Sequence, residues 1–470
     1  MLETHEKAVR ISPVHVFQEL EVTIDRLGYR GEGVARFEGF TIFVEQALPG
    51  ERVLAKVTKV EKSYAQATLL RIFEPSSLRQ LPPCPVFEVC GGCQLQHVSY
   101  AKQLEWKRQT VLDALVRIGH FSLDEVESIV SATYGMDDPW RYRNKVTVAV
   151  AKKGAKFVAG FVEEGTHDPV ESAECLIRPV MHDTLIAKAV AILEALSCSP
   201  YDESTRSGDI RQLIIRTNDQ HEAMVVVVVT HTLEQQMDVF CKRLAVECKQ
   251  ENIKLVSVVQ HIAPPGTRQL FARAPQTLWG KSYLKETIMG LSFRVSSRSF
   301  LQVNPLQTRT LYQLVLDTSD LCANDVVFDL YSGIGTLSLL AAKAAKKVIG
   351  VESVPQAVED AKDNARRNGI MNVEFVAGKA EDVVAGLIEE GSRPDVVLLD
   401  PPRVGCDRKV LEAIASGKPR SIAYVSCNPA TLARDLRILS DLGYAIQSVN
   451  PVDMFAQTAH VECLILMTRE

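Results

Sequence analysis

The stretch Asp329-Leu330-Tyr331-Ser332-Gly333-Ile334-Gly335-Thr336 decides the fold of the last third of the chain. The apolar run at 326–328 precedes it and predicts a buried parallel strand, and residues 337–342 follow it as the beginning of a helix. A strand, a glycine-containing turn and a helix together build the nucleotide site of Rossmann-like sheets. Gly333 and Gly335 would let a ligand approach the backbone, because neither residue has a Cβ.

Three features indicate which nucleotide this turn would bind. A second strand at 348–351 ends at Glu352, and an acid at that position suits two ribose hydroxyls. The turn lacks the G-x-G-x-x-G spacing of dinucleotide sites, and the acidic Asp329 disfavours a phosphate. A ligand with a ribose, a sulfonium cation and no phosphate fits best, which is S-adenosylmethionine. The alternative is an ordinary βα turn in a doubly wound sheet.

Length and composition describe a multidomain globular protein. The chain has 470 residues, 46% of them hydrophobic and 24% charged, and its net charge is −5. Any nucleic-acid binding must therefore use a local basic face. Residues 1–7 lack the apolar core of a signal peptide, and no apolar run reaches membrane-spanning length. We expect a cytoplasmic monomer without membrane contact, whose eleven cysteines are ligands, catalytic groups or core residues rather than disulfides.

Residues 13–74 predict a small five-stranded barrel of the oligonucleotide-binding kind. Apolar and polar residues alternate at 21–24 and 53–57, with several glycines and the turn Pro49-Gly50 between them. Cations and aromatic residues are interleaved from Arg26 to Tyr64 and could form a stacking surface for RNA. A solvated face on a small barrel is the alternative.

Three thiols follow within ten positions, at Cys84, Cys90 and Cys93, and Gly91-Gly92 can bend the chain so that they face one centre. Zinc or an iron–sulfur cluster would accept such ligands. Cys175 is the best candidate for the fourth ligand, and three unrelated buried thiols are the alternative. We assign residues 75–290 to a central, mostly β domain that houses this site.

Two stretches before the last third are candidates for ligand contacts. Cations alternate with aromatic residues at 140–145, ahead of a strand at 146–150, which suits either unpaired RNA bases or an exposed edge strand. Gln302 precedes a helix predicted at 308–318, and it is a plausible polar contact for a cofactor or a base.

The last third, residues 291–470, alternates strands and helices and predicts a Rossmann-like α/β domain. Further strands at 396–399 and 422–426 end in Asp400-Pro401-Pro402-Arg403 and Cys427-Asn428-Pro429. The ends of parallel strands lie along one edge of the sheet, where ligands bind. We therefore expect Asp329, Glu352, Asp400 and Cys427 to share one rim.

Two residues at this rim could carry out covalent chemistry on a pyrimidine. Cys427 lies between a strand and a helix, where the helix dipole would favour the thiolate. Glu462 begins an apolar strand with Cys463 on the opposite face, and a sheltered carboxylate there could act as a base. C5 of uracil accepts a methyl group only after a nucleophile has added to C6, so a thiolate and a base suit that reaction. A core cysteine and a solvated glutamate are the alternatives.

These residues resemble the RNA 5-methyluridine methyltransferases, the TrmA/RumA family. The resemblance covers the turn at 329–336, Asp-Pro-Pro-Arg at 400–403, the stretch 426–435 and the stretch 460–463, and the start of the chain resembles the TRAM domain. It implies that S-adenosylmethionine binds to Gln302, Tyr331, Glu352 and Asp400. It further implies that Cys427 is the nucleophile and Glu462 the base. The family's [4Fe-4S] cluster would be held by Cys84, Cys90, Cys93 and Cys175.

The presence of both a TRAM domain and the four cysteines resembles the family branch that modifies 23S rRNA. The expected activity is therefore methylation of C5 of an unpaired uridine in 23S rRNA, with a structural cluster. Methylation of tRNA, or of a base amino nitrogen, is an alternative enzymatic activity. A non-catalytic, cluster-bearing RNA-binding protein is the alternative from another class.

Overall fold

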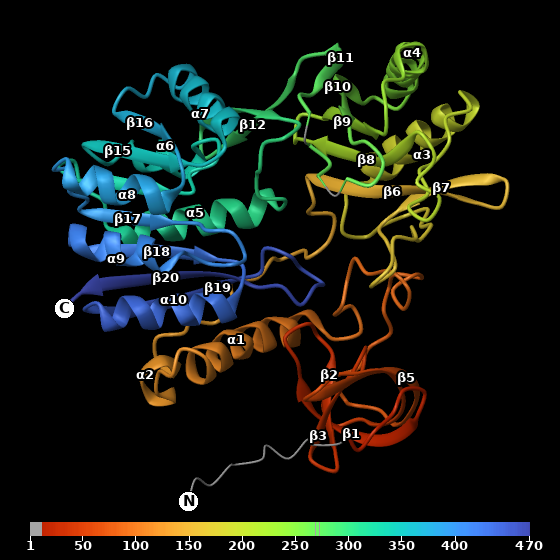
Figure 1. The fold of residues 1–470 in the computed structure, drawn as a ribbon, viewed down its shortest axis with the longest axis horizontal. Coiled ribbons are helices and arrows are strands. Elements are labelled where there is room, and N and C mark those ends of the chain that lie inside the picture. The colour runs from red at the N-terminus through yellow and green to blue at the C-terminus, as the bar shows by residue number, and fades with distance from the viewer. Residues whose placement is uncertain (1–11, 268, 272) are drawn as a thin grey trace, which may run out of the picture. The chain divides into compact units, whose positions relative to one another are not determined.

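The computed structural model describes residues 12–267, 269–271 and 273–470 (Figure 1). Residues 1–11, where the sequence lacks a signal-peptide core, lie outside the described residues. Internal contacts divide the chain into two units, each of which is described by itself. The small unit contains Met1–Glu88, Cys93–Gln103 and Gln457–Ala459, and the large unit contains Val89–Gly92, Leu104–Ala456 and His460–Glu470.

The small unit contains a closed five-stranded barrel in the order β1-β2-β3-β5-β4. Alternate residues of β1, including Leu20, Val22 and Ile24, point into its core because side chains alternate along a strand. The predicted barrel is therefore confirmed. Its strands are β1 (Glu19–Leu27), β2 (Gly33–Phe37), β3 (Phe40–Val44), β4 (Arg52–Val60) and β5 (Tyr64–Glu74).

The first sheet of the large unit has six strands in the order β11-β10-β9-β8-β6-β7. Every residue of β9 is buried, as expected for a central strand. Helices α3 (Val180–Ala195) and α4 (Glu234–Gln250) pack into its core. The sequence patterns predict α4 but not α3, because α3 is apolar around most of its circumference. The strands are β6 (Lys145–Lys153), β7 (Lys156–Gly160), β8 (Ile210–Thr217), β9 (Glu222–Val229), β10 (Lys254–Ile262) and β11 (Gln276–Gly280).

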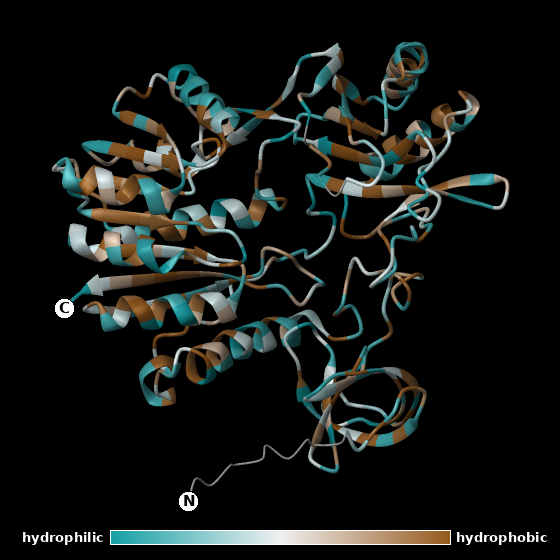
Figure 2. Cartoon of the chain, in the orientation of Figure 1, coloured by the Kyte–Doolittle hydropathy of each residue, from teal (hydrophilic) through white to brown (hydrophobic). Residues whose placement is uncertain are grey.

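The second sheet has seven strands in the order β16-β15-β14-β17-β18-β20-β19. The strands from β14 to β18 are parallel, and β20 is antiparallel to β18 and β19. Its strands are hydrophobic along much of their length in Figure 2, as expected for a sheet covered on both faces. The strands are β14 (Val326–Leu330), β15 (Lys347–Glu352), β16 (Val373–Ala377), β17 (Val396–Leu399), β18 (Ser421–Ser426), β19 (Tyr444–Val452) and β20 (Glu462–Arg469).

Helices cover both faces of this sheet, which confirms the predicted Rossmann-like α/β fold. One face packs against α5, α6 and α7, and the other packs against α8, α9 and α10. The sequence patterns do not predict α8, α9 or β19, and β19 contains Pro451, a residue that is unusual in strands. The helices are α5 (Pro305–Ser319), α6 (Thr336–Ala341), α7 (Pro355–Arg367), α8 (Ala380–Glu389), α9 (Arg408–Gly417) and α10 (Pro429–Asp441).

Helix α5 begins three residues earlier than the sequence predicts. The side chain of Asn304 caps it by accepting a hydrogen bond from the Gln307 backbone N–H at 3.2 Å, and Pro305 occupies the first turn. Two strands, β12 (Tyr283–Ile288) and β13 (Leu291–Ser296), form a hairpin shortly before it in the chain.

Helix α1 (Tyr100–Arg117), from Leu104 onward, packs on the seven-stranded sheet together with the short helix α2 (Leu123–Glu127). The fully buried Lys107 forms an ion pair with Asp453, and its Nζ donates to the Phe455 carbonyl at 3.1 Å. This contact fixes the segment that leads into β20. Within the described part of the chain, no helix is both long and apolar enough to cross a bilayer.

Candidate active site

A cavity of about 870 Å³ opens at the carboxyl edge of the seven-stranded sheet. A cavity of this size accommodates a cofactor-sized ligand. Six residues singled out from the sequence line it together. They are Gln302, Tyr331, Glu352, Asp400, Cys427 and Glu462.

The two glycines of the turn after β14 have different roles. Gly333 has a φ of +56°, lines the cavity and has open space where a Cβ would lie, so a ligand can reach its backbone. Gly335 has a φ of +80°, and a Cβ there would lie 2.7 Å from the Phe375 ring. Both glycines were expected to let a ligand approach the backbone, but Gly335 does not line the cavity, and its missing Cβ makes room for the Phe375 ring instead.

The Glu352 carboxylate is held at the edge of the cavity by backbone N–H groups. One oxygen accepts from Gly333 N at 3.0 Å and the other accepts from Val354 N at 2.7 Å. A carboxylate oxygen can accept more than one hydrogen bond, so this group can still receive ribose hydroxyls.

Asp329 does not line the cavity, contrary to the expected rim. Its side chain is buried beneath the turn, where it accepts a hydrogen bond from the Ser338 hydroxyl of α6. Burial raises the pKa of Asp329 to about 7. Its position indicates a structural role in joining β14 to α6.

Cys427 lines the cavity, but its thiol is not predisposed to ionise. Burial and the nearby carboxyls of Glu462 and Asp400 raise the pKa of Cys427 to about 11, and the charge and hydrogen bond of Arg403 only partly oppose this. Burial and these carboxyls therefore oppose the ionisation that the helix dipole was expected to favour. Asn428, whose side chain accepts from Ala430 N at 3.1 Å, is the N-cap, so Cys427 lies just outside the helix.

The Glu462 carboxyl is fully buried, which excludes a solvated glutamate at the end of a strand. Among the described residues, its Oε2 has no hydrogen-bond partner. Burial and the neighbouring Asp400 raise the pKa of Glu462, and Arg403 opposes the shift. Cys463 points into the core on the opposite face, as strand alternation predicts. The site thus contains a thiol and an unsatisfied carboxyl beside the same guanidinium.

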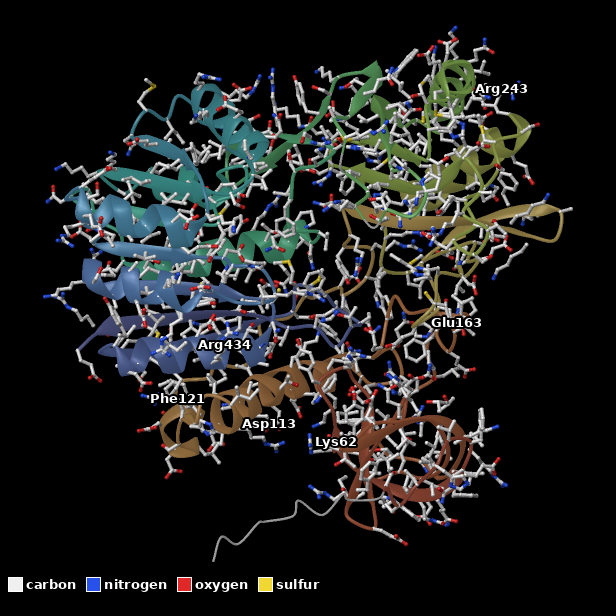
Figure 3. All side chains as sticks on the ribbon, in the orientation of Figure 1. Lys62, Asp113, Phe121, Glu163, Arg243 and Arg434 are labelled. Carbon is white, nitrogen blue, oxygen red and sulfur yellow. The ribbon has the colours of Figure 1, made fainter. Side chains whose placement is uncertain are left out.

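A hydrogen-bond network that the sequence did not reveal holds the loop after β17. The buried Asp435 accepts from Cys406 N at 2.8 Å, from the Tyr424 hydroxyl at 2.7 Å and from Arg434 Nε at 2.8 Å. Arg434 on α10 also donates to the Val404 carbonyl at 3.0 Å (Figure 3). The sequence assigned no role to Asp435 or Arg403, although both belong to stretches that carried the family resemblance.

The four cysteines predicted to hold a cluster belong to different units. Cys84 and Cys93 lie in the small unit, and Cys90 and Cys175 lie in the large unit. All four are half-buried and form no disulfide. Cys90 forms a β-bridge with Glu163. In residues 12–267, 269–271 and 273–470, no group of three or more His, Cys, Asp or Glu side chains is assembled as a metal site.

Comparisons with known proteins agree with this geometry. Residues 13–70 match the TRAM domain and residues 268–470 match the family described as tRNA (uracil-5-)-methyltransferase. An uncharacterized RNA methyltransferase of Listeria monocytogenes is 43% identical over 450 residues, which cover 96% of this chain and 97% of the relative. A protein of the same description from Halalkalibacterium halodurans is 43% identical over 457 residues, covering 97% and 98%.

One solved structure aligns over nearly the whole chain. The Pyrococcus abyssi tRNA (uracil-54, C5)-methyltransferase, in complex with S-adenosyl-L-homocysteine, covers 96% of this chain and 100% of its own, with a TM-score of 0.74 and 25% identity. The cavity at the carboxyl edge of the sheet is consistent with an adenosyl ligand. The chain therefore belongs to the S-adenosylmethionine-dependent RNA (uracil-5-)-methyltransferases, the TrmA/RumA family, and carries a TRAM domain.

Proposed function

We propose that this chain methylates C5 of an unpaired uridine in 23S rRNA, with Cys427 as the nucleophile and Glu462 as the base. One observation carries the mechanism. A thiol and a fully buried carboxyl oxygen without a hydrogen-bond partner among the described residues line one cavity at the cofactor edge of the sheet. A target base must leave its stack to reach such a site.

Each residue has a defined task in the proposed reaction. The Cys427 thiolate bonds to C6 of uracil, and the electron pair displaced from the C5–C6 bond makes C5 nucleophilic. S-adenosylmethionine, when bound, supplies the methyl group as an electrophile on a sulfonium. Glu462 then takes the proton from C5, the C5–C6 double bond re-forms, and the bond to the Cys427 sulfur breaks. The methylated base then leaves, and the Cys427 thiolate is restored.

The charges around the cavity support a reaction that begins only after the cofactor has bound. Glu462 is buried and Asp400 is half-buried, and desolvation holds the pKa values of both carboxyls above the ordinary range. A bound sulfonium cation would lower the pKa of both carboxyls and of the Cys427 thiol, because an opposite charge favours the ionised form. Gln302, Tyr331, Glu352 and Asp400 are the residues that we propose to hold that cofactor.

Ribosomal RNA is proposed over tRNA because the chain combines a TRAM domain with four cysteines that resemble a cluster site. A tRNA substrate is the second candidate, since a solved structure that aligns with nearly the whole chain is a tRNA methyltransferase. Either substrate would place the protein in the cytoplasm, as expected from the sequence.

We predict that cells with the intact gene contain 5-methyluridine in 23S rRNA that cells without it lack. Cys427→Ala should abolish this methylation, because no nucleophile remains, whereas Cys322→Ser should preserve it, since Cys322 is exposed and does not line the cavity. Mass mapping of 23S rRNA and tRNA measures both outcomes. Loss of 5-methyluridine from tRNA instead would favour the second candidate, and full methylation by Cys427→Ala would contradict the mechanism.

We predict that Glu462→Gln accumulates a covalent protein–RNA adduct. The amide cannot take the proton from C5, so the reaction stops before Cys427 is released. Denaturing gels of protein incubated with cofactor and labelled RNA would reveal the adduct, and RNA containing 5-fluorouridine should trap the unsubstituted protein in the same way. An enzyme acting on amino nitrogens, or a non-catalytic RNA-binding protein, would give no adduct with either substrate.

We also propose that Cys84, Cys90, Cys93 and Cys175 hold a [4Fe-4S] cluster. Their thiols fit this group because all four are half-buried and outside disulfides. The backbone carbonyl of Cys175 accepts two hydrogen bonds, from the Arg141 guanidinium at 3.3 Å and from Arg178 N at 3.3 Å. These bonds fix the backbone of the turn that contains Cys175. A cluster bonded to four thiolates would stabilise the loops that carry them.

Cys90→Ser should therefore lower the iron and acid-labile sulfide of anaerobically purified protein and reduce its melting temperature. Cys241→Ser is unsuitable as a control because Cys241 lies in a core, so the matched control is the exposed Cys322→Ser. Equal iron content in Cys90→Ser and unsubstituted protein would contradict the cluster assignment.

A further inference from the structure

A second cavity, of about 570 Å³, adjoins the site within the large unit. It lies among the start of α3, the β8–β9 turn, β12 and the start of α5. Gln302 lines both this cavity and the proposed methyl-transfer cavity, so the two are neighbours. Neither the proposed reaction nor its cofactor uses this second space.

Two buried acceptor groups in this cavity lack partners. Glu286 is 7% exposed and Asn144 is 6% exposed. Among the described residues, neither Glu286 Oε1 nor Asn144 Oδ1 has a hydrogen-bond partner, although Asn144 Nδ2 donates to the Gln302 carbonyl at 3.3 Å. A buried acceptor without a hydrogen-bond donor costs free energy of folding, so this side of the cavity suits a ligand that carries hydrogen-bond donors.

The charges around Glu286 also suit a nucleotide. Burial, together with Asp219 and Glu222, raises the pKa of Glu286 to about 7, while Arg216 and Arg309 oppose the shift. Arg309 is an exposed residue of α5 that lines the cavity. A guanidinium in this position can bind a phosphate, since its planar array of donors matches the phosphate oxygens.

We propose that this cavity is a second nucleotide subsite that binds an unstacked guanosine of the RNA substrate. The Glu286 carboxylate accepts from the N1–H and N2–H groups of guanine, and Arg309 contacts the phosphate. This inference rests on the proposed function, because it places the guanosine beside the uridine to be methylated.

Guanine is the base whose Watson–Crick edge best matches the hydrogen-bond acceptors of this cavity. It presents two adjacent donors, N1–H and the 2-amino group, which can pair with the two oxygens of one carboxylate. Adenine and cytosine each present one amino donor beside a ring-nitrogen acceptor. That acceptor would face the ionised carboxylate without a proton between them, so the selectivity is expected above the raised pKa of Glu286. Uracil presents one donor between two acceptors. Reading a base by its donors gives strong selectivity, because a mismatch leaves buried groups unpaired.

The test is a calorimetric titration of the full chain with the 5′-monophosphates of guanosine, inosine and adenosine. The protein is first saturated with S-adenosylhomocysteine so that the methyl-transfer cavity is filled. Guanosine monophosphate should bind most tightly, inosine monophosphate about tenfold more weakly because it lacks the 2-amino group, and adenosine monophosphate most weakly. Glu286→Gln should weaken guanosine monophosphate binding at least about tenfold. The control Glu247→Gln removes an acid of α4 that pairs with Lys188 at 2.8 Å, and should bind like the unsubstituted chain.

Equal binding of the adenine and guanine nucleotides to the unsubstituted chain would overturn the inference, even if Glu286→Gln failed to fold. Unchanged guanosine monophosphate affinity in a folded Glu286→Gln variant would also overturn it. Because these titrations require no methyl transfer, their failure is distinct from failure of the proposed function. Uridine methylation without selective guanine binding would reject only the subsite.

Discussion

The active site depends on the desolvation of two carboxyl groups, those of Glu462 and Asp400, near the Arg403 guanidinium. Glu462 is buried and Asp400 is half-buried, and the charge of Arg403 opposes the rise in the pKa of Glu462 and of the Cys427 thiol. Burial disfavours charge on every acid and thiol in the cavity. The isolated protein therefore holds its proposed base and nucleophile largely protonated. A cofactor that carries a positive charge would favour the ionised forms of the proposed base and nucleophile.

The fold keeps these groups in place from several directions. Asp435 on α10 holds the loop that contains Arg403, through its bonds to Cys406 N and the Tyr424 hydroxyl. The buried ion pair of Lys107 with Asp453 fixes the segment before β20, and Glu462 is the first residue of that strand. Breaking such a pair leaves an uncompensated buried charge. The precision of the site thus depends on contacts outside its lining.

The sequence predicts the residues of the site better than their chemical state. Tyr331, Glu352, Asp400 and Cys427 share one cavity because parallel strands end at one edge, and that rule needs only strand order. Glu462 joins them because the antiparallel strand β20 begins at the same edge. The fully buried state of Glu462 could not be predicted, since the neighbours that exclude water come from distant parts of the chain. For the same reason, helix-dipole reasoning alone omits the burial and the neighbouring carboxyls that raise the pKa of Cys427.

The second cavity illustrates the same limit. Glu286 lies on β12, within a region where the sequence contained no motif, and Asn144 belongs to a stretch of cations and aromatic residues. Only the fold brings them beside Gln302. Similarly, Asp329 was expected at the cavity because it lies at the end of a parallel strand, yet its hydrogen bond with Ser338 places it beneath the turn that follows.

The most direct test of this account is the number of protons released when the cofactor binds near pH 7. Calorimetry in buffers of different ionisation enthalpy should show that S-adenosylmethionine releases more protons than S-adenosylhomocysteine. The sulfonium cation lowers the raised pKa values of Glu462 and Asp400, and the neutral thioether does not. The difference should shrink in Glu462→Gln. Equal proton release by the two ligands in the unsubstituted protein would contradict the account.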